Sequence, residues 1–273
     1  MIASTFVDHP LACRLESGTT WRSVNYARGY QLLHPEGHCA VQEIAGGYAI
    51  YVAPGSPLNS ARGLGMEGSV SQDELQEVED FFFQRSQPAR IYVSPFADES
   101  LIVLLREAGY RLDSFFSMLF TLIPEGYQPG PLPEGFTITQ AIPEQADDWL
   151  RVTAAGFEET DNPSPEAIDI LGPNFYAPES TAFLVRFGNQ LAGGGGMYTH
   201  SSVVELGGAS TRPAFRRKGI QRALIEARLA TARSKGCDLA MVLTEPGGDS
   251  QRNLQRNGFE LAYTLVIMRK GLK

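Results

Sequence analysis

The period of apolar and polar positions switches repeatedly along the chain between that of a strand and that of a helix. The clearest stretch is residues 203–233, where a short apolar run predicts a strand and residues spaced by three and four predict a helix starting at Ile220. The apolar face of this expected helix comprises Ile220, Ala223, Leu224, Ala227, Ala230 and Thr231. Strand and helix are joined by a turn that holds Pro213 and the run Arg216-Arg217-Lys218-Gly219.

Elsewhere the pattern predicts further strands and helices on both sides of a Pro- and Gly-bearing segment. Gly46-Gly47 predicts a β-hairpin, Ser71 with Glu74 predicts a capping box, and short helices are expected within residues 1–28. More strands are expected at 89–93, 112–123, 136–140, 182–187, 190–198, 238–243 and 263–268, and more helices at 101–108, 143–157, 165–171 and 250–256. Mixed, mostly antiparallel strands flanked by helices predict an α+β fold, an α/β sandwich.

A fixed offset of 149 residues relates the two halves of the chain. It carries Gly109 to Gly258 and Val93 to Val242, and the expected elements coincide without a gap. We therefore expect two tandem modules, at 1–125 and 136–273, with a linker at 126–135. In this register Glu67-Gly68-Ser69-Val70 corresponds to the basic run, so only the second module is expected to bind a phosphate-bearing ligand.

The basic turn is the strongest candidate for chemistry. A strand that leads through a glycine-bearing turn into a helix directs backbone N–H groups and the positive end of the helix dipole at one point. Three consecutive cations beside that point suit a pyrophosphate. The alternative is a solvated basic turn before an ordinary helix.

Residues 211–221 resemble the acyl-CoA loop of the GNAT superfamily of N-acyltransferases. Arg216 and Gly219 match its first two fixed positions, whereas Gln221 replaces the final small residue. The resemblance implies direct transfer of an acetyl group from acetyl-CoA, as co-substrate, to a primary amine. It implies cofactor contacts from Ala209, Ser210, Thr211, Arg216, Arg217, Lys218, Gly219, Ile220 and Gln221, and from the S-x-x-N helix residues Ser250 and Asn253. For these last two, the alternative is a helix cap at Asp249 or Ser250 with Asn253 merely exposed.

Catalytic candidates follow from the same resemblance. Glu205 on the strand before the loop is the candidate general base, with a solvent-facing carboxylate as the alternative. Leu254 occupies the position of the family's frequent tyrosine acid, so Tyr198 or Tyr263 would replace it, or the thiolate would leave into water. The expected acceptor residues are Phe157, Glu158 and Glu159, with Asp161, whose carboxylates would favour a cationic amine.

The glycine run 193–196 predicts close approach to the strand backbone, by a ligand, a helix or a bulge.

Composition narrows the possibilities. A net charge of −8 argues against nucleic acid as the main partner, and no segment resembles a membrane span or a signal peptide. Three widely spaced cysteines argue for a reducing compartment and against a disulfide framework or a metal site. We expect a cytoplasmic N-acetyltransferase, monomeric or homodimeric, acting on a small amine or a peptide amine. The alternatives are a non-catalytic acyl-CoA-binding or regulatory protein and a tandem scaffold.

Overall fold

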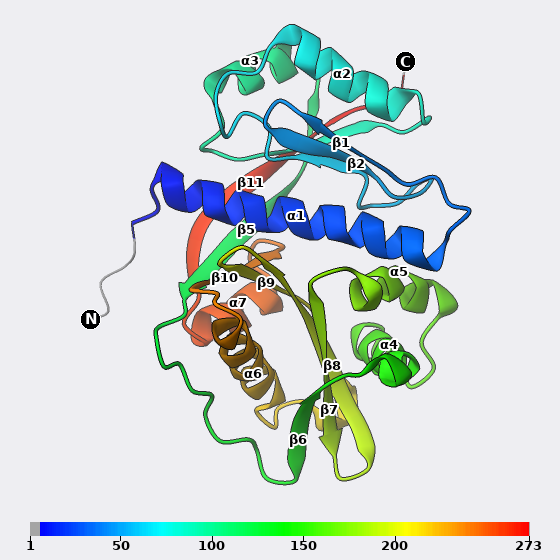
Figure 1. Cartoon of the computed structure of the whole chain (residues 1–273), viewed down its shortest axis with the longest axis vertical. Helices are drawn as coiled ribbons and strands as arrows, with labels where there is room; N and C mark the ends of the chain where they lie inside the picture. The colour runs from blue at the N-terminus through cyan, green and yellow to red at the C-terminus, as the bar shows by residue number, and fades with distance from the viewer. Residues whose placement is uncertain (1–5, 273) are drawn as a thin grey trace. The chain divides into compact units, whose positions relative to one another are not determined.

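The computed structural model describes residues 6–272, which pack into two compact units. The first unit contains residues 6–27, 34–120 and 243–272, and the second contains residues 28–33 and 121–242. Each unit contains its own run of neighbouring strands and its own helices (Figure 1). The α+β expectation is confirmed.

Strands of the first unit lie in the order β1-β2-β3-β4-β11-β5. These strands are β1 (Ala40–Ile44), β2 (Gly47–Tyr51), β3 (Ser60–Arg62), β4 (Ala89–Val93), β5 (Arg111–Leu122) and β11 (Glu260–Lys270). The helices that contribute to this unit are α1 (His9–Leu33), α2 (Gln72–Phe83), α3 (Glu99–Glu107) and α7 (Asp249–Arg256). Side chains of α2, α3 and the strands form its apolar core, with Val78, Phe82 and Leu101 fully buried.

The last strand of the chain lies inside the first unit. Residues of β11 pair antiparallel with β4 on one side and with β5 on the other. Residues 243–272, which we expected in the second module, therefore pack with the first unit.

In the second unit the strands lie in the order β10-β9-β8-β7-β6, and only the β9–β10 pair is parallel. They are β6 (Phe136–Gln140), β7 (Ser180–Phe187), β8 (Gln190–His200), β9 (Val203–Thr211) and β10 (Leu239–Thr244). The helices are α4 (Ala146–Phe157), α5 (Pro165–Tyr176) and α6 (Ile220–Ser234), with short 3-10 turns at Pro143–Gln145 and Pro213–Phe215.

Close helix packing explains the glycine run of β8. A Cβ added to Gly194 would lie 2.5 Å from the Thr153 hydroxyl of α4, and one added to Gly195 would lie 2.9 Å from Leu224 of α6. Because successive strand residues point to opposite faces, α4 and α6 cover opposite faces of β8, as Figure 1 shows. Of the three expected causes of the run, the structure shows two, the helix contacts and a β-bulge in the β8–β9 pair between Gly194 and Gly196.

Several local predictions are confirmed. The hairpin forms, with its turn at Ala45-Gly46, one residue before the expected Gly46-Gly47, and Ser71 and Glu74 form the capping box of α2. Gly236 follows α6 with a left-handed backbone, φ +89°. Residues 126–135, which we expected to form a linker, belong to the second unit, where the Gly130 amide donates to Glu226 of α6 at 2.8 Å.

Two local predictions were wrong. In place of short helices near the N-terminus, one helix of 25 residues runs from His9 to Leu33; residues 1–5 of that prediction lie outside the described part. On α6, the later residues Ala227, Ala230 and Thr231 are only half-buried. The buried face continues instead through Arg228, Leu229 and Ala232.

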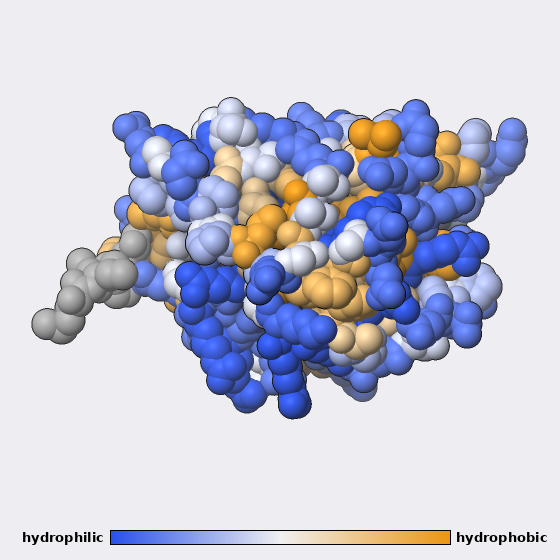
Figure 2. All heavy atoms as spheres, turned by 90° about the horizontal axis from the view of Figure 1, so that it is seen from below, coloured by the Kyte–Doolittle hydropathy of each residue, from blue (hydrophilic) through white to orange (hydrophobic). Residues whose placement is uncertain are grey.

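The surface is mixed in character. Figure 2 shows a face on which hydrophilic residues predominate and hydrophobic ones gather in smaller patches. Within residues 6–272 no helix is both long enough and apolar enough to span a bilayer. In the same part of the chain, no cluster of three His, Cys, Asp or Glu side chains is placed to hold a metal ion.

Candidate functional site

The turn between β9 and α6 presents an open helix N-terminus. Gly219 is the N-cap, with a left-handed φ of +77°, and no side chain caps the helix. The first hydrogen bond of the helix joins the Ala223 amide to the Gly219 carbonyl at 3.1 Å. The N–H groups of the first turn have no partner further back in the helix, and together with the helix dipole they form an anion-binding point.

The three cations of the turn have different roles. Arg216 donates to the carbonyls of Thr211 at 3.2 Å and Gly156 at 3.0 Å, and it pairs with Glu159 at 2.6 Å. It therefore braces the turn against the end of α4. Arg217 and Lys218 are exposed, and among the described residues the Arg217 side chain makes no hydrogen bond or ion pair. Both residues lie beside the helix N-terminus, and the Lys218 ammonium also lies 5.5 Å from the ring centroid of Phe187 and 5.6 Å from that of Phe215.

Arg217 is also held in an unusual conformation. Its φ is +62°, which costs a non-glycine residue on the order of 1 kcal/mol. With Gly219 it places two left-handed residues around Lys218 immediately before the helix. Successive turns of this kind can direct neighbouring backbone N–H groups into one concavity.

Side chains at the end of β9 hold the strand rather than face a ligand. The Ser210 hydroxyl donates to the Thr153 carbonyl at 2.7 Å, and the Gln221 amide donates to the Thr211 hydroxyl at 2.8 Å. Ser210, Thr211 and Ile220 are all buried. The departure from the family pattern at Gln221 thus ties the first turn of α6 to the end of β9.

A β-bulge interrupts the β8–β9 pair shortly before the turn. Gly196 pairs with Gly207 and Gly194 with Ser210, so β9 has one residue more than β8 between these pairs. Gly208 has a φ of +56°, which marks the bulge. Bulged residues leave the regular hydrogen-bond ladder, so backbone groups around Gly208 and Ala209 can turn toward a ligand.

Two buried side chains hold the strands at this bulge. Trp149 donates its indole N–H to the Gly195 carbonyl at 3.2 Å. Arg228 donates to the carbonyls of Gly196 at 3.0 Å and Gly207 at 3.4 Å. Burial lowers the pKa of Arg228 to about 10.

We did not predict Arg228 from the sequence, although a signal was present. It stands eight residues after Ile220 and four after Leu224, on the helix face predicted to be apolar. Because burying an unpaired cation is costly, an arginine on an apolar helix face indicates that buried hydrogen-bond acceptors lie opposite it.

Glu205 and Tyr198 are direct partners across β9 and β8, so their side chains share one face of the sheet. Both are buried. The Tyr198 hydroxyl donates to the Asn174 side chain of α5 at 2.6 Å, which places this face on the side of α5. The structure thus places the candidate base on the face of the sheet that α5 covers.

Other candidate residues lie in the first unit. The Tyr263 hydroxyl is buried and donates to Glu16 at 2.9 Å. Ser250 is exposed in the first turn of α7, and Asn253 accepts a hydrogen bond from Asn257. The N-cap of α7 is Gly248 without a side-chain bond, so the alternative of a cap by Asp249 or Ser250 is wrong.

The acidic acceptor candidates are engaged by neighbouring residues. Glu158 accepts from the backbone and hydroxyl of Ser164, and these hydrogen bonds lower its pKa. Glu159 pairs with Arg216, and Asp161 pairs with Arg212. These carboxylates therefore no longer support a preference for cationic acceptors. Phe157 is 54% exposed at the end of α4.

The corresponding segment of the first unit has the opposite charge. Glu67 and Gly68 line a pocket of about 390 Å³ together with Asp98 and His9. Two carboxylates disfavour a phosphate there.

Comparisons with known proteins agree with this geometry. Residues 145–259 match the model of the acetyltransferase (GNAT) family. The fold is similar to a GCN5-related N-acetyltransferase from Kribbella flavida, with a TM-score of 0.68, 17% identity and coverage of 95% of each chain. No curated protein matches the sequence.

Two further solved structures share the fold. One is a GCN5-related N-acetyltransferase from Sphaerobacter thermophilus, with a TM-score of 0.54 and 17% identity over 85% of this chain and 75% of that one. The other is a tandem GNAT protein from the clavulanic acid biosynthesis pathway, with a TM-score of 0.54 and 11% identity over 81% and 73%. The GNAT resemblance is confirmed, and the likeness in fold extends beyond residues 145–259.

Proposed function

We propose that the protein is an acetyl-CoA-dependent N-acyltransferase whose donor site lies on the β9–α6 turn. The observation that carries the proposal is the uncapped N-terminus of α6 with Arg217 and Lys218 beside it. Backbone N–H groups and two cations would receive the pyrophosphate of CoA. Arg216 would keep the turn in place through its bonds to Gly156 and Thr211.

Acyl transfer also needs hydrogen-bond donors for the thioester carbonyl, and the β9 bulge supports a place for them. Backbone N–H donors near Gly208 and Ala209 would hold the thioester carbonyl and stabilise the oxyanion formed when the amine attacks. Trp149 and Arg228 would fix these donors by holding the neighbouring carbonyls.

Glu205 is the proposed general base. It would take the proton of the attacking amine, directly or through a water molecule. The hydroxyls of Tyr198 and Tyr263 donate to Asn174 and Glu16, so we assign neither as the acid. A thiolate is a good leaving group near neutral pH and would be protonated by water.

One observation favours a second candidate, an acyl-CoA-binding protein without catalysis. Leu254 occupies the place of the family's frequent tyrosine acid, and the two tyrosines that could replace it are engaged elsewhere. Such a protein would bind acetyl-CoA through the same turn and would not release CoA.

Calorimetric titration of the full chain with acetyl-CoA tests the binding step. We expect one site, because the matching segment of the first unit is acidic. Arg217→Ala with Lys218→Ala should weaken binding roughly 10- to 100-fold, since two charge-assisted contacts are lost. Arg222→Ala, an exposed arginine on the same helix, is the control and should bind normally. An unchanged affinity in the double variant would refute the site.

Turnover separates the two candidates. CoA release would be followed with a panel of primary amines and peptides, using wild type and Glu205→Gln. An enzyme should release CoA, and Glu205→Gln should lower kcat roughly 10²- to 10⁴-fold while the affinity for acetyl-CoA persists. Binding without release across the panel would favour the non-catalytic protein.

A further inference from the structure

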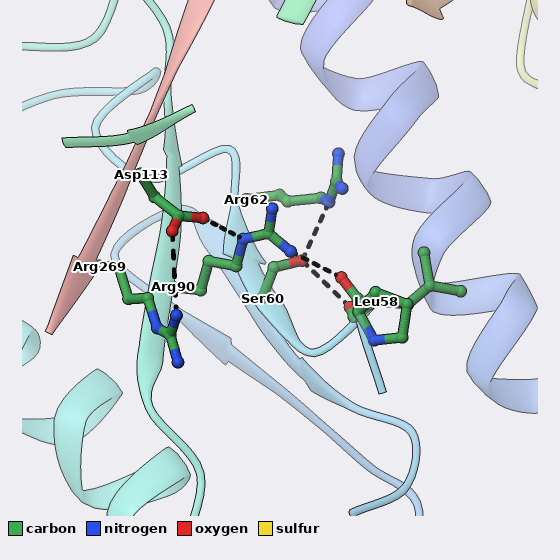
Figure 3. Close-up of polar contacts among 7 residues, drawn as sticks. Leu58, Ser60, Arg62, Arg90, Asp113 and Arg269 are labelled. Carbon is green, nitrogen blue, oxygen red and sulfur yellow. Dashed lines mark hydrogen bonds and ion pairs between the residues drawn. The ribbon is translucent and has the colours of Figure 1, made fainter. Parts of the chain in front are cut away.

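The first unit contains a polar pocket that the acyl-transfer proposal does not use. It has a volume of about 290 Å³ and lies between the loop at 55–59 and the strands β4, β5 and β11. Its charged side chains are Arg90, Asp113 and Arg269 (Figure 3). We call it the arginine pocket.

Two arginines face each other across the β4–β11 pair. Arg90 and Arg269 are direct partners in the register, an arrangement that places like charges side by side and is unfavourable by itself. An anion between them would remove the repulsion and receive charge-assisted hydrogen bonds.

Asp113 supplies part of the negative charge that the two arginines need, and a bulge in β5 places it there. Ile267 pairs with Ser114 and Met268 with Leu112, so Asp113 is an extra residue on β5. A bulge re-aims the side chain at that position. The Asp113 carboxylate lies 3.2 Å from Arg90 and 3.9 Å from Arg269.

The compensation is incomplete, because one carboxylate faces two guanidinium groups. Arg90 is the better satisfied, since it also donates to the Pro57 carbonyl at 2.9 Å. The Arg269 side chain is 54% exposed, and within residues 6–272 it makes only the 3.9 Å ion pair. Its planar set of donors thus remains open toward the pocket.

The rest of the wall is held by its own hydrogen bonds. The Asn59 side chain accepts a hydrogen bond from the Val52 amide at 2.8 Å and donates one to the Ala53 carbonyl at 2.8 Å. The Gln87 side chain accepts a hydrogen bond from the Gly55 amide at 3.1 Å. These bonds fix the loop around the arginines, so the pocket is formed without a ligand.

We propose that the arginine pocket binds a small molecule through an oxyanion, a carboxylate or a phosphate group, received by Arg269 with support from Arg90. A guanidinium group matches either oxyanion with two parallel N–H donors. The volume is close to the lower end of small-molecule sites, which fits a ligand the size of a small organic acid or phosphate ester.

Titration of the full chain with inorganic phosphate and, separately, with malonate tests this assignment and distinguishes the two oxyanions. Arg269→Gln should weaken binding roughly tenfold, since one charged partner is lost. Arg106→Gln, an exposed arginine on α3, is the matched control and should bind like wild type. Asp113→Asn should bind the anion several-fold more tightly, because it removes the competing carboxylate.

A thermal melt of Asp113→Asn adds a readout independent of affinity. Without anion its melting temperature should fall, because two arginines then face each other without a carboxylate, and phosphate or malonate should restore it. Equal binding by the Arg269→Gln and Arg106→Gln variants would show non-specific attraction and overturn the proposal. An absence of binding at millimolar phosphate and malonate would also overturn it.

Discussion

A buried guanidinium holds the bulged part of the β8–β9 pair. Arg228 is 2% exposed, and its guanidinium donates to the backbone carbonyls of Leu224, Gly196 and Gly207. Burying a cation is costly, so its retention indicates that the strand carbonyls near the bulge need a donor.

Replacing this arginine tests that role. Arg228→Met should destabilise the protein by about 2 kcal/mol, because carbonyls of β8 and β9 lose their donor inside the core. Arg222→Met on the exposed side of the same helix should change stability by less than about 0.5 kcal/mol. Urea denaturation of both variants measures the difference, and equal stabilities would contradict the interpretation.

The buried carboxyl of Glu16 should make the stability of the protein depend on pH. It is buried on α1, and desolvation raises its pKa from 4.5 to about 7 despite hydrogen bonds from Tyr263 and Ser94. Because the folded state then holds this proton more tightly than the unfolded state, this residue favours folding most at low pH. Its contribution to the free energy of unfolding falls as the pH rises from 4.5 to 7, by about 3 kcal/mol in total.

Glu16→Gln should remove most of this contribution. The variant should be more stable than wild type at pH 8 and close to it at pH 5, since the amide oxygen can still accept from Tyr263. Urea midpoints across this range measure the effect. Parallel pH profiles for the two proteins would exclude Glu16 as the source.

At the scale of elements, α2 begins with a complete capping box. The Glu74 amide donates to the Ser71 hydroxyl at 3.2 Å, and the Ser71 amide donates to the Glu74 carboxylate at 2.7 Å. Ser71→Ala should therefore cost about 1 kcal/mol of stability. Ser250→Ala is the control, because no side chain caps α7. Chemical denaturation compares the two, and a similar loss in both would argue against a specific cap.

At the scale of the whole molecule, the C-terminal strand completes the sheet of the first unit. β11 pairs with both β4 and β5, so a chain that ends at Phe259 leaves facing edges of both strands without partners. Amide hydrogens of β4 and β5 should then lose protection from exchange, as measured by mass spectrometry. Removing only the last three residues should leave protection unchanged. Retained protection in the longer truncation would show that β11 is dispensable.

Sequence patterns determined most elements of this protein and the basic turn on which the proposed donor site rests. The strand Val203–Thr211, the cap of α2, the basic run before α6 and the family resemblance all depend on residues that are close together in the chain. Local periodicity, caps and turn residues report such features because their physical causes lie within a few residues.

Only the tertiary structure decided which charged side chains are paired within the protein and which are not. Arg216 bonds to Gly156 and Glu159, some sixty residues earlier in the chain, so of the three cations in the run only Arg217 and Lys218 have no ion pair among the described residues. Likewise, β11 belongs with β4 and β5, and Asp113 meets Arg269, through pairings that no local pattern encodes. Hydrogen bonds, ion pairs and strand pairing between distant segments depend on their positions in space, and the folded chain alone sets those positions.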